Sequence, residues 1–406
     1  MSEWKKVKLG DVCVRVTSGG TPKADITSYY NPPTIPWLKT KEVNYCRITE
    51  TENHISEEGL ANSSAKIITP NSVIIAMYGQ GDTAGRVAIN KIPLTTNQAC
   101  CNLTIDESKA DYEFIYYQLC TLYNKMVSLK AGAAQPNLNA RIIKNLEVLL
   151  PSLSTQHHIA AILSRYDSLI ENYQKQIKLL EEAAQRLYKE WFVDLRFPGH
   201  EHTKIVNGLP DGWEKKKVEE LIIKTPKTKQ VSANKYQKSG QIPIIDQSRN
   251  YIAGYTDDMD CIVKVTVPYI VFGDHTRILK YISFSFAKGA DGTQLIMSND
   301  LKRMPQSLLY NSLKGIDLSS YSYARHFKYL KEETLLLPTE CVAKKYDVIV
   351  AKHYYDIQKC RNQIRLLTEA RDRLLPKLMS GEIEVGEDGL KGQQSVSPMA
   401  TPWVRK

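Results

Sequence analysis

The sequence predicts an α+β fold in which one plan occurs twice, each copy being a mixed domain of strands and helices followed by a long helix. Residues 176–187 (QIKLLEEAAQRL) match residues 363–374 (QIRLLTEARDRL) at eight of twelve positions, at an offset of 187. The same offset places Leu149-Leu150-Pro151 on Leu336-Leu337-Pro338 without a gap. Because internal repeats decide architecture, we expect two units of the same construction.

The other end of the unit repeats as well. Trp4-Lys5-Lys6 pairs with Trp213-Glu214-Lys215 at an offset of 209, so insertions and deletions lie inside the unit, between matched ends. The predicted segments are a first mixed domain at 1–150, a long helix at 151–197, a linker at 198–212, a second mixed domain at 213–337, a second long helix at 338–383 and a disordered tail at 384–406.

Each mixed segment alternates short β-rich runs with Gly, Pro and Asn turns and then continues into a helix. In the first segment we expect strands over 72–77, 86–89 and 99–105 and a helix over 112–129. In the second we expect strands over 263–272 and 279–286 and a helical stretch near 300–314.

Both long helices carry apolar residues at alternating steps of four and three, the pattern of a coiled-coil seam. The predicted seam residues are Ile159, Leu163, Tyr166, Ile170, Tyr173, Ile177, Leu180, Leu187, Val350, Ile357, Ile364, Leu367 and Leu374. Arg371 interrupts the second row where Ala184 stands in the first. Each helix could instead pack only on its own domain. Mutual pairing is favoured because about 37 residues span roughly 55 Å, more than one such domain covers.

Composition limits the class of protein. The formal net charge is +10 at pH 7 and the isoelectric point is about 9.0, which favours a polyanion as partner. No apolar run is long enough to span a membrane, and no apolar core follows the N-terminus as in a signal peptide. The eight cysteines are scattered without a CxxC pair, which excludes a zinc ribbon and favours the reducing cytoplasm.

Motifs of catalysis are incomplete in this sequence. Asn31-Pro32-Pro33-Thr34 has the start of the loop with which adenine methyltransferases hold a flipped base, but threonine replaces the stacking aromatic residue. Gly79-x-Gly81-x-x-x-Gly85 has the spacing of neither a dinucleotide fingerprint nor a P-loop. His157 and His158 point about 100° apart on a helix and do not readily share a metal. We therefore predict no catalytic residue, metal or cofactor in this chain.

Two loops occupy corresponding places in the two copies and carry side chains that can read base edges. Turn chemistry also uses many of these residue types, so both interpretations stay open. The candidate DNA-binding residues are Tyr78, Gln80, Asp82, Thr83, Arg86, Asn97 and Gln98 in the first copy, and Asp274, His275, Thr276, Arg277, Lys280, Thr293 and Gln294 in the second. Lys217, from a lysine-rich run, is added as a candidate phosphate contact.

The arrangement resembles the specificity subunit of type I restriction-modification systems over roughly residues 3–385. The motifs that carry the resemblance are Leu9-Gly10-Asp11-Val12, Ser18-Gly19-Gly20-Thr21-Pro22, Ile35-Pro36-Trp37, Thr96-Asn97-Gln98-Ala99, Leu209-Pro210-x-Gly212-Trp213, Gly273-Asp274-His275-Thr276, Gly289-Ala290-Asp291-Gly292-Thr293 and Leu378-Met379-Ser380-Gly381-Glu382-Ile383. Their order within a two-copy plan is the specific signal. The second boundary departs from the pattern, because 339–345 lacks the Gln156-x-x-Ile159-Ala160 arrangement.

The resemblance implies a non-catalytic subunit with two target-recognition domains, each reading one half of a split, asymmetric site in double-stranded DNA. It implies that the two long helices pair antiparallel as a spacer, with pseudo-twofold symmetry, and hold two modification subunits. S-adenosylmethionine, ATP and magnesium would belong to partner subunits, namely the modification subunits and a restriction and translocation subunit. The alternatives are a coiled-coil scaffold with protein-binding domains and a self-contained DNA methyltransferase.

Overall fold

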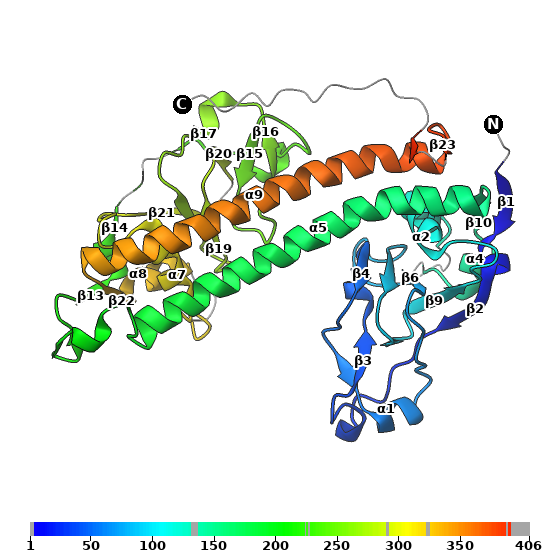
Figure 1. Cartoon of the computed structure of the whole chain (residues 1–406), viewed down its shortest axis with the longest axis horizontal. Coiled ribbons are helices and arrows are strands. Elements are labelled where there is room, and N and C mark those ends of the chain that lie inside the picture. The colour runs from blue at the N-terminus through cyan, green and yellow to red at the C-terminus, as the bar shows by residue number, and fades with distance from the viewer. Residues whose placement is uncertain are drawn as a thin grey trace. The chain divides into compact units, whose positions relative to one another are not determined.

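The structure is a computed structural model that describes residues 4–130, 137–223, 225, 228–289, 292–321, 325–386 and 389–390. The chain forms two compact units, one of Met1–Leu169 with Leu366–Lys406 and one of Ile170–Arg365 (Figure 1). Each unit contains one mixed domain and a portion of both long helices. The division into units therefore cuts across the segments expected from the sequence, because each long helix belongs to both units.

The repeated ends of each unit meet as a two-stranded antiparallel sheet. In the first unit β1 (Lys5–Lys8) pairs with β10 (Glu147–Leu150), with Lys5 opposite Leu150. In the second unit β13 (Glu214–Lys217) pairs with β22 (Thr334–Leu337), with Glu214 opposite Leu337. Lys5 and Glu214 differ by 209 and Leu150 and Leu337 by 187, the two offsets found in the sequence. In both copies the two ends of the repeated unit therefore pair at equivalent positions.

The central sheets of the two units share their strand order. In the first unit the order is β2 (Cys13–Ser18), β9 (Cys100–Ile105), β6 (Val73–Ala76), β7 (Val87–Asn90) and β4 (Cys46–Ile48). In the second unit it is β14 (Ile222–Ile223), β21 (Thr293–Ser298), β18 (Tyr269–Gly273) and β19 (Leu279–Ile282). β6 and β18 are wholly or almost wholly buried, as expected for strands covered on both faces.

A smaller sheet also recurs. In the first unit β3 (Ile35–Leu38) lies between β5 (His54–Ile55) and β8 (Thr95–Thr96), parallel to β8. In the second unit β15 (Ile242–Ile245) lies between β16 (Gly254–Thr256) and β20 (Phe286–Lys288), parallel to β20, which also pairs with β17 (Ile262–Val263). The short helices are α1 (Glu57–Ala61), α2 (Tyr112–Thr121), α3 (Tyr123–Ser128), α4 (Ala140–Lys144), α6 (Val218–Leu221), α7 (Gln306–Lys314) and α8 (His326–Glu332).

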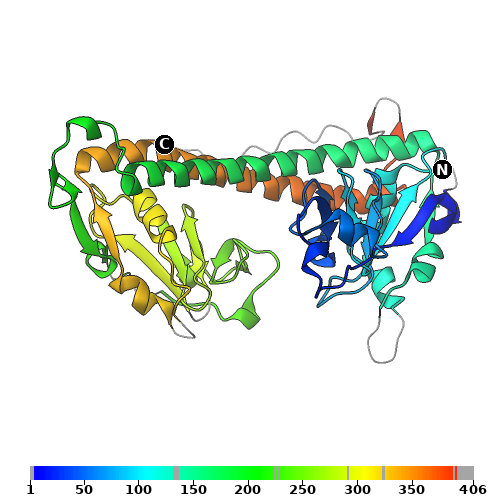
Figure 2. The same ribbon diagram turned by 90° about the horizontal axis from the view of Figure 1, so that it is seen from below.

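The two long helices, α5 (Leu153–Tyr188) and α9 (Glu340–Met379), run antiparallel within each unit (Figure 2). In the first unit Asp167 contacts Arg371. In the second unit Gln176 contacts Cys360 and Ala184 contacts Tyr346, so the residue number falls on one helix as it rises on the other. A π-helical turn, Lys189–Val193, extends α5. Every predicted seam residue is buried or half-buried. The α+β fold with a repeated plan and paired helices is confirmed.

The interruption of the seam at Arg371 is filled by a charged cluster in the first unit. Arg371 Nη1 donates to Asp167 Oδ1 at 2.6 Å, and Arg47 Nη1 from β4 donates to Asp167 Oδ2 at 3.0 Å. The Tyr117 hydroxyl of α2 donates to the same carboxylate at 2.5 Å, and Arg47 Nη2 also donates to Glu113 at 3.2 Å. Burial alone would lower the pKa of Arg47, but its contacts with Tyr117, Glu113 and Asp167 outweigh burial and raise that pKa.

Several expected elements are divided or more ordered than predicted. The helix over 112–129 breaks at Leu122, which separates α2 from α3. The strand over 263–272 divides into β17 and β18, because Pro268 has no backbone N–H for a ladder. The strand over 279–286 likewise divides between two sheets, as β19 and β20.

The segment predicted as a linker, 198–212, contains a hairpin of β11 (Ile205–Val206) and β12 (Leu209–Pro210). Asn207 and Gly208 both have positive φ in its two-residue turn, the pair that a tight hairpin favours. Of the predicted disordered tail, 384–406, the described residues include a short pairing of β23 (Val385–Gly386) with β24 (Gly389–Leu390). The rest of the tail lies outside the described residues.

Candidate nucleic-acid interface

The two predicted loops of the first copy lie side by side. The loop that starts after β6 meets the segment before β9, because Ala76 pairs with Cys100 and the Met77 amide donates to the Ala99 carbonyl at 2.7 Å. The sheet order therefore brings Tyr78 and its neighbours to the same edge as Asn97 and Gln98.

The second copy repeats this juxtaposition. Gly273 at the end of β18 pairs with Thr293 at the start of β21, and the Asp274 amide donates to the Gly292 carbonyl at 2.7 Å. Because β18 and β21 correspond to β6 and β9 in strand order, both units present a pair of loops at the same edge of the same sheet.

The loop of the first copy is held by its own polar side chains. Arg86 pairs with Asp82, and its Nη1 donates to Asn44 at 3.0 Å. The Thr83 hydroxyl donates to the Gln80 carbonyl at 2.7 Å, which is turn chemistry. The charge of Arg86 is therefore largely balanced, and the exposed Gln80 and half-buried Tyr78 are the side chains available to a ligand.

The opposite side of this edge is exposed at Gln98 and half-buried at Asn97. Gln98 accepts a hydrogen bond from the Thr21 hydroxyl, and Asn97 Oδ1 accepts one from the Cys100 thiol at 3.3 Å. Gln98 thus retains its amide N–H groups for a partner.

In the second copy three predicted contact residues are buried and serve the fold. Asp274 is 3% exposed and its carboxylate accepts from the Phe327 amide at 2.8 Å, which fixes the start of α8. Lys280 is 4% exposed and donates to the carbonyls of Asp246 and Asn250. Thr293 is 1% exposed within β21. The sequence predicted these three as DNA contacts, but their burial leaves little of their surface for a ligand.

The exposed members of this loop are His275, Thr276 and Arg277. The Thr276 hydroxyl donates to the Gln247 carbonyl at 2.7 Å, and Arg277 Nη1 donates to the Leu318 carbonyl at 3.1 Å. His275 donates its backbone amide to Gln247 Oε1 at 3.1 Å, and its side chain is exposed. Lys217 is exposed on the separate β13–β22 sheet, with its ammonium 3.9 Å from Glu219.

Replacing Lys280 with methionine tests its structural role through pH. Burial lowers the pKa of Lys280 to about 8 from its ordinary 10.5, against the opposing charge of Asp246. A lowered lysine pKa costs stability below the folded value, and the cost disappears as pH rises to the unfolded value. We expect the stability of the wild type relative to Lys280→Met to increase by about 2–3 kcal/mol from pH 7.5 to pH 10.5. Urea unfolding of both chains across this range measures it, and a constant difference would contradict it.

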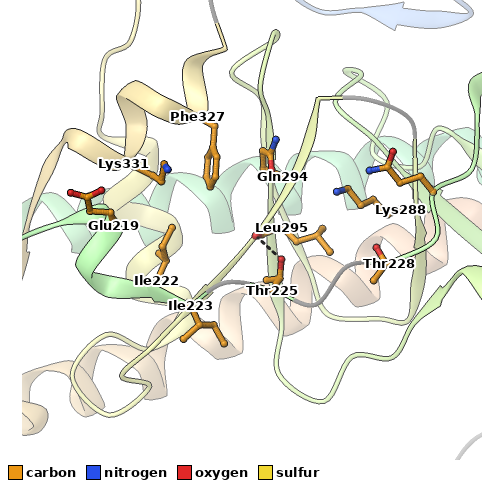
Figure 3. A pocket seen from close by; sticks show the side chains of 11 residues that line it. Glu219, Ile222, Ile223, Thr225, Thr228, Lys288, Gln294, Leu295, Phe327 and Lys331 are labelled. Carbon is orange, nitrogen blue, oxygen red and sulfur yellow. Dashed lines mark hydrogen bonds between the residues drawn. The ribbon is translucent and has the colours of Figure 1, made fainter.

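Gln294 lines a cavity of about 700 Å³ instead of the loop edge (Figure 3). The cavity lies between β14, β20, β21 and α8, with Lys288, Phe327 and Lys331 among its walls. Thr225 donates to the Leu295 carbonyl at 3.5 Å across its floor. Gln294 therefore faces the cavity and does not share the exposed surface of His275 and Arg277.

Two contributors to the loop edges were not predicted. The Gly20 amide donates to the Thr96 carbonyl at 2.8 Å, and a Cβ at Gly19 would lie 2.1 Å from the Thr96 oxygen. Only glycine allows this approach, which brings Thr21 to Gln98. In the second copy Gln247 supports His275 and Thr276. The Ser18-Gly19-Gly20-Thr21 run was the sequence signal for the glycine contact in the first copy. Nothing in the sequence marked Gln247 in the second.

Among the described residues no group of three or more His, Cys, Asp or Glu side chains converges as a metal site. Within the same residues no helix has the length and apolar character needed to cross a membrane.

Comparison with known proteins finds one kind of relative along the chain. The family model described as the type I restriction modification DNA specificity domain matches residues 1–182. The specificity subunit of the type I restriction enzyme MjaIX from Methanocaldococcus jannaschii is 26% identical over 95% of this chain and 94% of its own length. The chain is therefore similar to the type I restriction enzyme specificity subunits over nearly its whole length. The prediction of a specificity subunit, and not an enzyme, is thereby confirmed.

Other specificity subunits are similar over shorter or more divergent stretches. The EcoR124I/EcoR124II specificity subunit of Escherichia coli is 25% identical over 48% of each chain. The crystal structure of the S subunit of a type I restriction-modification system from M. genitalium has the same fold, with a TM-score of 0.61, 16% identity and coverage of 92% of this chain and 96% of that one.

Proposed function

We propose that this specificity subunit gives a type I restriction-modification complex its DNA sequence specificity, each mixed domain reading one half of a split, asymmetric site in double-stranded DNA. The first recognition domain lies within residues 1–150 and the second within 213–337. The observation that carries the proposal is the repeated loop pair at one edge of the same sheet in both units, between boundary strands of identical register. Loops on a rigid scaffold suit recognition because their sequence varies without changing the fold.

The side chains proposed to contact DNA are those the structure leaves accessible, namely Tyr78, Gln80, Asn97, Gln98, His275, Thr276 and Arg277, with Lys217 on phosphate. Asp82, Thr83 and Arg86 hold the first loop in shape. Amide, imidazole and guanidinium groups provide the donors and acceptors that distinguish base pairs in the major groove.

We further propose that the helix pair separates the two recognition domains and holds two modification subunits. Large apolar side chains remain exposed on the helices, among them Leu179, Val348 and Tyr355 in the second unit and Leu169 and Leu366 in the first. Such residues on a helical surface suit packing against a partner protein. The modification subunits and a restriction and translocation subunit would carry S-adenosylmethionine, ATP and magnesium. The complex would work in the cytoplasm, where the eight thiols stay reduced.

Exchange of one domain tests independent readout. Residues 9–146, which lie between β1 and β10, are replaced by the corresponding segment of another specificity subunit, and both boundary strands are kept. We expect the methylated motif in cells that also express the modification partner to change in one half only, because the second unit is untouched. Methylome sequencing reads the motif. A change in both halves, or in neither, would contradict the proposal, and loss of all methylation by a folded chain would favour a scaffold.

Single substitutions test the loops. Gln98→Ala and His275→Ala are each expected to weaken binding of the cognate duplex by about 1–3 kcal/mol, because a lost base contact costs that much. Lys217→Ala is expected to weaken cognate and random duplexes equally, as a phosphate contact does. Fluorescence anisotropy with both duplexes measures the difference. Unchanged cognate affinity in both loop variants would leave turn chemistry as the sufficient explanation of these loops.

A further inference from the structure

A cavity of about 280 Å³ in the second unit is bordered by positive charge. It lies where the recognition domain packs on the helix segments of that unit. Its walls are Glu181 of α5, Arg249 and Tyr251 of the β15–β16 loop, Ile278, residues 279–281 of β19, Tyr310 and Lys314 of α7, and Arg361 of α9. The ammonium of Lys280 donates to backbone carbonyls. The remaining cations of the wall are Arg249, Lys314 and Arg361, and the wall contains one carboxylate, that of Glu181.

One of the cations is held in place by an aromatic ring. The guanidinium of Arg361 lies 3.8 Å from the ring centroid of Tyr251, and its Nη2 donates to Glu181 at 3.1 Å. The Tyr251 hydroxyl donates to the Tyr281 carbonyl at 2.7 Å, so the ring itself is fixed. The guanidinium of arginine has five N–H donors in one plane. When it is stacked on a ring, the side chain loses less conformational entropy on binding an anion.

The other two cations have no carboxylate within 4 Å among the described residues. Arg249 is exposed at the rim, and Lys314 is exposed with its ammonium 5.7 Å from the ring of Tyr310. A cavity with several unneutralised cations focuses positive potential and raises the local concentration of anions. Three basic side chains from a loop, α7 and α9 therefore converge on one small volume.

We propose that this cavity binds a phosphate group of the DNA backbone, which rests on the proposed function and extends it to a contact outside the recognition loops. A phosphodiester offers the negative charge and acceptor oxygens that Arg249, Lys314 and Arg361 satisfy. Phosphate contacts set the position of a protein on the duplex and carry no sequence information. The site therefore fixes where the second domain sits on DNA, and the loops select the bases.

The test uses the double variant Arg249→Gln/Lys314→Gln, which leaves the Arg361–Glu181 pair intact. The full chain, purified with its modification subunits, is titrated with a cognate and a random 30-base-pair duplex across a salt series. The two basic residues share one phosphate, and the loss of one phosphate contact is expected to reduce the slope of log affinity against log salt by about 0.9. At 0.1 M salt this amounts to about eightfold weaker binding per contact, equal for both duplexes.

The matched control is Lys264→Gln/Lys302→Gln, which removes the same charge from exposed lysines of the same domain that do not line the cavity. Equal slopes for the cavity and control variants would overturn the proposal. It would also be overturned if the cavity variant lost binding of inorganic phosphate or ATP but kept the wild-type DNA slope, because the site would then serve free anions. A folded wild type that binds no duplex would contradict the proposed function itself.

Discussion

Asp167→Ala is expected to lower the free energy of unfolding of the first unit by about 3–5 kcal/mol, because it leaves the buried Arg47 and the half-buried Arg371 around a missing carboxylate. The Asp167 side chain is 6% exposed and Arg47 is 7% exposed, so water does not replace the lost partner. Tyr117 also loses its acceptor. Removing one member of a buried ionic cluster costs more than the cluster's net contribution, since the remaining charges stay desolvated.

The second unit supplies the matched control. Tyr354 follows Asp167 by the repeat offset of 187, and its hydroxyl donates to Asn311 at 2.8 Å in an uncharged cluster. Tyr354→Phe removes one neutral hydrogen bond and is expected to cost about 0.5–1.5 kcal/mol. Urea unfolding with hydrogen exchange at the amides of α2 and α7 assigns each loss to its unit. Equal losses in the two variants would show that the charged cluster does not hold the first domain on its helices.

These two clusters show how far sequence reasoning reaches. The heptad rows predicted the paired helices, and the two repeat offsets located the matched ends of each unit, because both patterns repeat at fixed spacing. That these ends pair as strands was not predicted. Arg371 was visible only as an interruption of the seam. Its partners Asp167, Arg47 and Tyr117 are 204 or more residues away in the chain, and nothing local in the sequence joins them.

The candidate site was predicted less completely, also because the contacts that decide it join residues far apart in the sequence. The sequence located the loops from strand-turn patterns but not which side chains point inward. Asp274 and Lys280 have the residue types of DNA contacts, yet tertiary contacts with Phe327, Asp246 and Asn250 bury them. The hairpin at Asn207-Gly208 was in contrast a local signal that was available and was read as a linker.

Lengthening both helices by four residues is expected to lengthen the gap between the two half-sites by one or two base pairs. The insertions go after Leu169 in α5 and after Arg365 in α9, where both helices pass from one unit to the other. Paired insertions keep Glu181 opposite Arg361 and Asp167 opposite Arg371, which an insertion in one helix would not. Four residues add about 6 Å, and a four-residue stutter is tolerated in coiled coils. Methylome sequencing measures the gap.

The rotation that accompanies each insertion makes the test sharper. Four residues turn an α-helix by about 40° beyond one full turn, which lies between the roughly 34° of one base pair and the roughly 69° of two. The two half-sites then stay on the face that each domain reads. Seven residues add about 10 Å, near three base pairs, but turn the helix by only about −20° while three base pairs turn DNA by roughly 100°. If the helices set the spacing, the four-residue variant methylates a longer motif and the seven-residue variant loses activity although it folds. An unchanged gap in the folded four-residue variant would refute the spacer role.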